Sequence, residues 1–221
     1  MAHFFRSIPD IEYVNRFPNA KLSEYIRSKN LFTRVKIRDD VFQNIMYFTK
    51  YNIVGDERPD NVAYSYYGDP TFDWVVLLSN NIVNVYDEWP LTQQAFDTYL
   101  IEKYGTYDKI NAVHHYESEK VLNSKGIKIL DEGLVVPANY SVTFFDPGLG
   151  KEVTKSGITR PITNFDYENK IENDKRSIYL IKEEYLNMIV DDIVNALEYK
   201  EGSTQFVSET LKRVDNIRLF Q

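Results

Sequence analysis

Two adjacent histidines are the residues of this sequence with the clearest capacity for chemistry. They are His114 and His115, and the chain has one further histidine, His3. An imidazole ring can ligate a metal ion or transfer a proton near neutral pH. The run Ala112–Tyr116 predicts a β-strand, on which neighbouring side chains point to opposite faces. We therefore expect that the two rings do not grip one ion, and a metal site would also need a third convergent ligand.

Paired carboxylates are the second candidate for chemistry, as Glu183-Glu184 and Asp191-Asp192. The first pair falls in the first turn of a predicted helix, where negative charge suits the helix dipole. The second lies on the polar side of the same helix. No phosphate-binding glycine loop, nucleophile elbow or zinc spacing is present. We predict no catalytic residue, no cofactor and no metal, and a protein that is not an enzyme.

Composition limits the class of protein further. The 221 residues are 43% hydrophobic, with 17 Tyr, 13 Phe and 2 Trp, which is ample for a packed core. The net charge of −7 argues against a nucleic-acid partner, because phosphate binding needs concentrated positive charge. There is no cysteine, which suits folding in a reducing cytoplasm. No stretch approaches the ~20 apolar residues of a membrane span, and no signal peptide is recognisable, so we predict no membrane association.

The elements that must position a functional surface are clearest between residues 41 and 91. Alternation from Ile45 to Ile53 predicts a strand within Val41–Val54. Pro59 starts a helix that Gly68 ends. Asp69-Pro70 starts a second helix, which ends at Asn80-Asn81 in the left-handed conformation. Residues 82–91 are predicted to be extended.

The side chains of this module divide into two groups. The predicted core consists of Val62, Ala63, Trp74, Val75, Leu77 and Leu78. The predicted protein-interaction residues, with the aromatic ones as exposed anchors, are Tyr67, Asn80, Asn81, Tyr86 and Trp89.

The rest of the chain predicts an α+β protein with C-terminal helices. The lead-in contains a short helix at Leu22–Ser28, and residues 106–162 form a small antiparallel sheet with a hairpin turn at Asp146–Glu152. Helices are predicted at Asn164–Lys175 and in the segment that contains the stripe from Leu186 to Leu197. The apolar residues of the terminal arms have no local core, and we expect them to order on assembly. The predicted parts are 1–40 (N-terminal arm), 41–91 (module), 92–162 (helix and sheet) and 163–221 (C-terminal helical segment and tail).

The order strand, helix, turn, helix, strand resembles the βααβ arrangement of the LysM module. The end of the second helix, "LLSNNI", is similar to the leucine-asparagine end of a LysM second helix. The resemblance implies a LysM-like module at residues 41–91.

The stretch Arg58–Thr92 resembles still more the small baseplate wedge protein of T-even-type contractile-tailed phages. That family has a similar Arg-Pro start, Tyr-Gly-Asn/Asp-Pro turn, Trp-Val-Leu-Leu helix and terminal Asn. A second block, Tyr167–Leu197, is similar to the family's helix, strand and closing helix. The resemblance implies a structural protein of the virion's tail baseplate, assembled in the host cytoplasm. It would bridge or clamp neighbouring wedge subunits, with wedge and hub-proximal proteins of a six-fold assembly as its partners.

The alternative is a LysM-type protein that binds N-acetylglucosamine polymers such as peptidoglycan or chitin. The loops that would form the sugar groove depart from the usual pattern, since they read "GDERP" and "DEWPLT". Both functions stay open at the level of the sequence. Under the alternative, changes at Asp56 or Trp89 should weaken retention on the glycan.

Overall fold

The computed structural model describes residues 4–21 and 23–215, which form helices and several small antiparallel sheets. The α+β class predicted from the sequence is therefore confirmed. The chain divides into two compact units. Unit 1 consists of Met1–Trp89 and Ser177–Gln221, and unit 2 of Pro90–Arg176.

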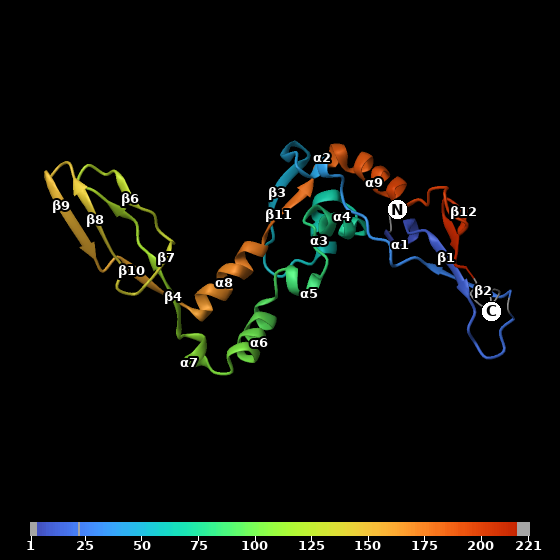
Figure 1. The fold of residues 1–221 in the computed structure, drawn as a ribbon, viewed down its shortest axis with the longest axis horizontal. Coiled ribbons are helices and arrows are strands. Elements are labelled where there is room, and N and C mark those ends of the chain that lie inside the picture. The colour runs from blue at the N-terminus through green and yellow to red at the C-terminus, as the bar shows by residue number, and fades with distance from the viewer. Residues whose placement is uncertain (1–3, 22, 216–221) are drawn as a thin grey trace. The chain divides into compact units, whose positions relative to one another are not determined.

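The centre of unit 1 is a two-stranded antiparallel sheet of β3 (Phe48–Asn52) and β11 (Ser177–Ile181), which lie side by side in Figure 1. The strand predicted within 41–54 is thus real but short. Its expected first part is instead α2 (Asp39–Phe42) and the 3₁₀ helix η1 (Ile45–Tyr47). The Asn44 side chain accepts a hydrogen bond from the Met46 amide, which favours this turn over continued extension.

Two helices, α3 (Pro59–Tyr67) and α4 (Asp73–Ser79), follow β3 as predicted. Pro59 occupies the first turn of α3, and Gly68 ends it at φ 73°, in the left-handed region that glycine tolerates best. A 3₁₀ turn, η2 (Pro70–Phe72), leads into α4 and is capped by Asp69. Asn81 follows α4 at φ 53°, which confirms the left-handed stop.

The extended segment predicted for residues 82–91 is wrong. The chain forms a helical turn there, α5 (Val85–Glu88), whose cap is the Asn84 side chain accepting from the Tyr86 amide at 3.1 Å. The strand that completes the helix pair is β11, which arrives only after unit 2. Two strands and two helices are therefore present, but the second strand comes from a distant segment.

Helix α9 (Glu183–Leu197) closes the core of unit 1, in agreement with the stripe seen in the sequence. Its buried face includes Leu186, Ile189 and Ile193, which pack in one cluster with Trp74 and Val75 of α4. A second cluster on the other side of α4 joins Val76 to β3, α3 and β11.

The two ends of the described chain meet in a second sheet of unit 1. Its strand order is β12-β13-β1-β2, with β1 parallel to β13. The bounds are β1 Asp10–Val14, β2 Tyr25–Lys29, β12 Phe206–Ser208 and β13 Leu211–Arg213; helix α1 (Phe4–Ser7) precedes them.

This sheet corrects two expectations. The short helix predicted at 22–28 is wrong, since residues 25–29 form β2, with Leu22 outside the described residues. The described parts of the N-terminal and C-terminal arms pair with each other, whereas no partner was predicted for either arm from the sequence. Ion pairs from Asp10 to Arg27 (2.7 Å) and from Glu12 to Arg213 (2.8 Å) connect neighbouring strands. Residues 216–221 of the tail lie outside the described range.

Unit 2 begins with a small helical part. Its helices are α6 (Gln93–Tyr104), α7 (Tyr107–Ile110) and α8 (Asn164–Lys175), the last with the bounds predicted from the sequence. Thr163 and Asp166 form a capping box at the start of α8. The apolar core is limited to Phe96, Leu100 and Ile110, with Leu91 and Tyr104 packed against it.

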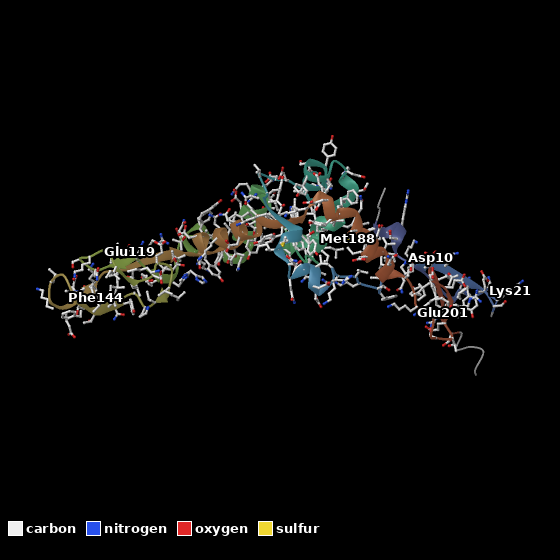
Figure 2. The ribbon with its side chains drawn as sticks, turned by 90° about the horizontal axis from the view of Figure 1, so that it is seen from above. Asp10, Lys21, Glu119, Phe144, Met188 and Glu201 are labelled. Atoms are coloured by element: carbon white, nitrogen blue, oxygen red, sulfur yellow. The ribbon has the colours of Figure 1, made fainter. Side chains whose placement is uncertain are left out.

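The β part of unit 2 confirms the small antiparallel sheet. One sheet has the order β10-β4-β7, and two hairpins, β5-β6 and β8-β9, accompany it (Figure 1). The side chains of this part, which includes Glu119 and Phe144, are drawn in Figure 2. The strand bounds are β4 Val113–Ser118, β5 Val121–Leu122, β6 Lys128–Leu130, β7 Val135–Val136, β8 Ser141–Asp146, β9 Lys151–Ser156 and β10 Thr159–Thr163.

The β8-β9 hairpin has its turn where the sequence predicts it. The Asp146 carboxylate accepts hydrogen bonds from the amides of Ser124 (3.0 Å) and Gly148 (2.9 Å) and from the Ser124 hydroxyl. The position favours glycine, because a Cβ at Gly148 would clash with the Ser124 hydroxyl oxygen, which the Asp146 carboxylate already holds. These contacts connect the β8-β9 turn to the β5-β6 hairpin.

Candidate protein-interaction surface

The residues predicted to form the module core lie where α3 and α4 meet the central sheet. Val62, Ala63, Trp74 and Val75 are buried, whereas Leu77 and Leu78 are half-buried at the edges of the two clusters. Val76, which the sequence reading omitted, is fully buried. Its position was recoverable, because a helix with apolar residues on nearly all sides is expected to be buried on most of them.

Trp89 is not the exposed anchor that the sequence predicted. Its side chain is only 6% exposed and packs with Ile53 and Leu180. The indole Nε1 donates a hydrogen bond to the Glu57 carbonyl oxygen at 2.9 Å. Because α5 turns the chain back toward the sheet, Trp89 closes the core beneath the loop that precedes α3.

The two tyrosines of the interaction set differ in their surroundings. Tyr67 is half-buried, and its hydroxyl donates to the Ile181 carbonyl oxygen at 2.9 Å, which fixes α3 to β11. Burial raises the pKa of Tyr67 above its usual value, so the hydroxyl stays a donor. Tyr86, by contrast, is 87% exposed.

Asn80 occupies the outer edge of β11. Its Nδ2 donates to the Tyr179 carbonyl oxygen at 2.9 Å, and its Oδ1 accepts from the Tyr179 amide at 2.8 Å. The side-chain amide thus pairs with the strand as a neighbouring backbone would, and it satisfies groups that an edge otherwise leaves open. Asn81 lies beside it, with its Oδ1 accepting from Arg34 Nη2 at 3.0 Å.

Replacing Asn80 should therefore cost stability and not merely change a surface. We expect Asn80→Ala to lower the free energy of unfolding by about 1–3 kcal/mol, because Tyr179 loses both partners. Chemical denaturation of the purified variant measures this. Asn81→Gly is the matched control, since glycine keeps the left-handed backbone and the substitution should change stability by less than about 1 kcal/mol. Equal losses in the two variants would contradict the edge-pairing role of Asn80.

An apolar groove of about 320 Å³ lies next to this edge. The groove is lined by Phe48 and Tyr179 of the central sheet, Ser79 of α4 and residues of the α2–η1 segment, including Phe42 and Ile45. Phe42 also lines a neighbouring hollow of about 180 Å³, together with Leu78, Asn81 and others. The two hollows thus share Phe42, and each is lined by a residue from the end of α4.

The exposed apolar side chains beside the groove were missed by the sequence reading. Ile45 is 70% exposed, and Met46 is nearly as exposed. The alternation in the sequence predicts a strand that includes Ile45, whereas the structure has the 3₁₀ helix η1 there. The signal that could have found the turn is the Asn44 side chain, which competes with strand pairing by capping its own backbone.

The groups that could carry chemistry are dispersed. Glu183, Glu184 and Asp191 are exposed on α9, and Asp192 pairs with Arg38 at 3.5 Å. Among the described residues, no group of three or more histidine, aspartate or glutamate side chains is placed to hold a metal ion.

The two adjacent histidines, however, do not point apart as expected. Their Nδ1 atoms lie 2.8 Å from each other, and the rings meet edge to face. The pairing of β4 with β10 shifts register between Ile162 and Thr163, opposite these residues. This bulge interrupts the regular alternation of side chains and brings both rings together.

The strongest polar cluster in unit 2 surrounds Glu168 of α8. The carboxylate is buried and accepts hydrogen bonds from Lys103 Nζ (2.6 Å), the Tyr104 hydroxyl (2.8 Å) and the Tyr99 hydroxyl (3.1 Å). Burial raises the pKa of Glu168, but these donors outweigh it and hold the pKa below its usual value. The cluster joins α8 to α6, and we assign it a structural role.

The described part of unit 1 is thus a helix pair on a two-stranded sheet with an apolar groove beside it. The sequence model of the family described as base plate wedge protein 53 matches residues 3–196. The chain therefore belongs to this family, whose members are structural proteins of the phage tail baseplate. Its location is accordingly the tail baseplate of the virion.

A relative among characterised proteins agrees with this assignment. The chain is 25% identical to "Baseplate wedge protein gp53" of Enterobacteria phage T4 over 177 residues, which cover 74% of this chain and 86% of the relative. Within the described part of the chain, no helix has the length and apolar character needed to cross a bilayer.

Proposed function

We propose that this chain bridges neighbouring wedge subunits during baseplate assembly, and that it acts by binding and not by catalysis. Membership of the wedge-protein family carries the proposal. Its partners would be other wedge and hub-proximal proteins in a six-fold assembly. The dispersed carboxylates and the apolar character of the groove support a binding role over a chemical one.

The contact surface we propose is the groove of unit 1 with its rim. It includes Phe42, Ile45, Met46, Asn81 and Tyr179, and Tyr86 is a separate exposed anchor. Exposed aliphatic and aromatic side chains next to a hollow are the usual anchors of protein interfaces. Trp89 and Tyr67 would support this surface from beneath, since both are held by hydrogen bonds to the backbone.

The glycan-binding alternative receives less support from the site. The loop before α3 and the segment around Trp89 would form the sugar groove, yet the indole is buried and donates to Glu57. An aromatic ring must be accessible to stack on a sugar. Retention on peptidoglycan or chitin that depends on Asp56 would favour the alternative.

Co-expression with the wedge proteins of the same phage tests the proposed surface. We expect Ile45→Asp to reduce capture of the partner by at least about tenfold, because a carboxylate would have to be buried against the partner's apolar surface. The side chain is exposed, so the melting temperature should stay unchanged. Leu149→Asp, an equivalent change in the β8-β9 turn of unit 2, is the matched control and should retain capture. Wild-type capture by Ile45→Asp would refute the role of the groove.

A further inference from the structure

The paired histidines of unit 2 go beyond the proposed function, because their geometry limits how many protons the pair can carry. The two Nδ1 atoms are 2.8 Å apart, which is hydrogen-bond distance. One Nδ1 must then carry a hydrogen and the other must accept it. The Nε2 atom of His115 faces the Glu117 carboxylate at 3.4 Å, which favours a hydrogen on that nitrogen. His115 is thereby the acceptor at Nδ1, and His114 is the donor.

Protonation changes this contact in two steps. A first proton can enter at the free Nε2 of His114 and leave the Nδ1 contact intact. A second proton must enter at Nδ1 of His115, where two N–H groups would face each other. The doubly protonated pair also places two positive charges in contact, so the rings must separate.

The surrounding charges do not offset the repulsion between two protonated rings. On β4, Glu117 faces His115, but it is shared with Arg160 of β10 (3.4 Å) and Lys170 of α8 (3.8 Å). Asp166 of α8 is engaged by Thr163 in the capping box. The third strand, β7, contributes only Val135 and Val136. One carboxylate that already serves two cations cannot neutralise two imidazolium rings.

The pair lies where the helical part of unit 2 joins its β part. The His114 ring stacks on Tyr167 of α8 with centroids 4.1 Å apart and planes within 9°. His115 meets the same tyrosine edge to face. Opening the Nδ1 contact therefore loosens the packing of α8 on β4 at the register shift.

We propose that His114 and His115 form an acid-sensitive latch between α8 and the β4–β10 sheet, closed by one shared proton and opened when both rings are charged. The latch is closed while one of the two Nδ1 atoms lacks a hydrogen, and it opens when acid has charged both rings.

Hydrogen exchange of the whole chain, read by mass spectrometry and corrected for intrinsic rates, tests the latch. When the chain is acidified until nitrogen NMR shows both rings charged, we expect exchange in residues 113–118 and 164–170 to become about fivefold faster, the effect of losing one hydrogen bond. His114→Phe keeps an aromatic ring for Tyr167 but cannot share a proton, so its exchange should not change with pH. An unchanged wild type, or an equal change in His114→Phe, would overturn the proposal.

Nitrogen NMR of the imidazole rings gives a second readout that does not depend on any variant. At pH 8, the spectrum should show one Nδ1 that carries hydrogen and one that does not, in the two rings of the pair. Two rings with the same Nδ1 state at pH 8 would also overturn the latch.

Discussion

Trp74→Ala should lower the free energy of unfolding of the chain by about 3–5 kcal/mol, the usual cost of truncating a buried aromatic side chain. Trp74 is 9% exposed and lies in the cluster that joins α4 to α9. Its ring also contacts Phe4, with centroids 5.4 Å apart, so the substitution loosens the N-terminal helix as well. Removing the indole leaves a cavity that the backbone of two helices cannot close.

Equilibrium denaturation followed by circular dichroism measures this loss. Tyr86→Ala is the matched control, because that ring is exposed and its removal should change stability by less than about 0.5 kcal/mol. Losses of similar size in the two variants would show that the indole does not hold α4 and α9 together.

Glu168→Ala should destabilise unit 2 by about 2–3 kcal/mol, because two tyrosine hydroxyls and an ammonium lose a shared buried acceptor. This loss of stability is smaller than the cost of breaking a fully buried ion pair, because Lys103 is partly exposed and can return to water. The same donors make the stability that Glu168 contributes depend on pH. The folded-state pKa of Glu168 is depressed, so its stabilisation is present above the ordinary value of 4.5 and is lost as pH falls through the lower folded-state value.

Thermal or urea unfolding at pH 7 and at pH 3 checks both statements. The difference between wild type and Glu168→Ala should be largest at pH 7 and should shrink at pH 3. Asp174→Ala, which changes a carboxylate of the same helix that lies outside this cluster, is the control. A difference that is the same at both pH values would exclude the ionised Glu168 as its source.

Local signals in the sequence predicted much of the fold of unit 1. Pro59, Gly68 and the Asn80-Asn81 end fixed the bounds of the helix pair, because backbone preferences act over a few residues. The stripe of α9 was equally clear, since its apolar face recurs at helical spacing. The core residues of α3 and α4 follow from the same periodicity.

Several errors arose where a distant segment decides the structure. The partner of β3 is β11, from the other side of unit 2, and no local pattern in residues 82–91 could disclose that. The arms likewise pair across the whole chain, as in the contact of Asp10 with Leu211. Trp89 was predicted to be exposed because the loop at Glu57 covers its ring only once α5 has turned the chain.

The candidate surface was predicted only in part, for the same reason. Asn81 and Tyr86 are exposed, which follows from the local sequence, and their role in binding a partner stays a prediction. The role of Asn80 at the β11 edge, and the groove beside it, required the position of a strand from another part of the chain. The contact of His114 with His115 depends on a bulge, which a two-residue alternation cannot reveal.

Reconstitution of the wedge from co-expressed subunits of the same phage, with and without this chain, tests the bridging role most directly. Electron microscopy and mass measurement of the particles report whether wedges join. The account predicts joined, six-fold particles only when the chain is present, and separate wedges when it is omitted. The bridging role would be contradicted by complete particles that form when the chain is omitted. Complete particles that do not incorporate the chain when it is supplied would contradict it as well.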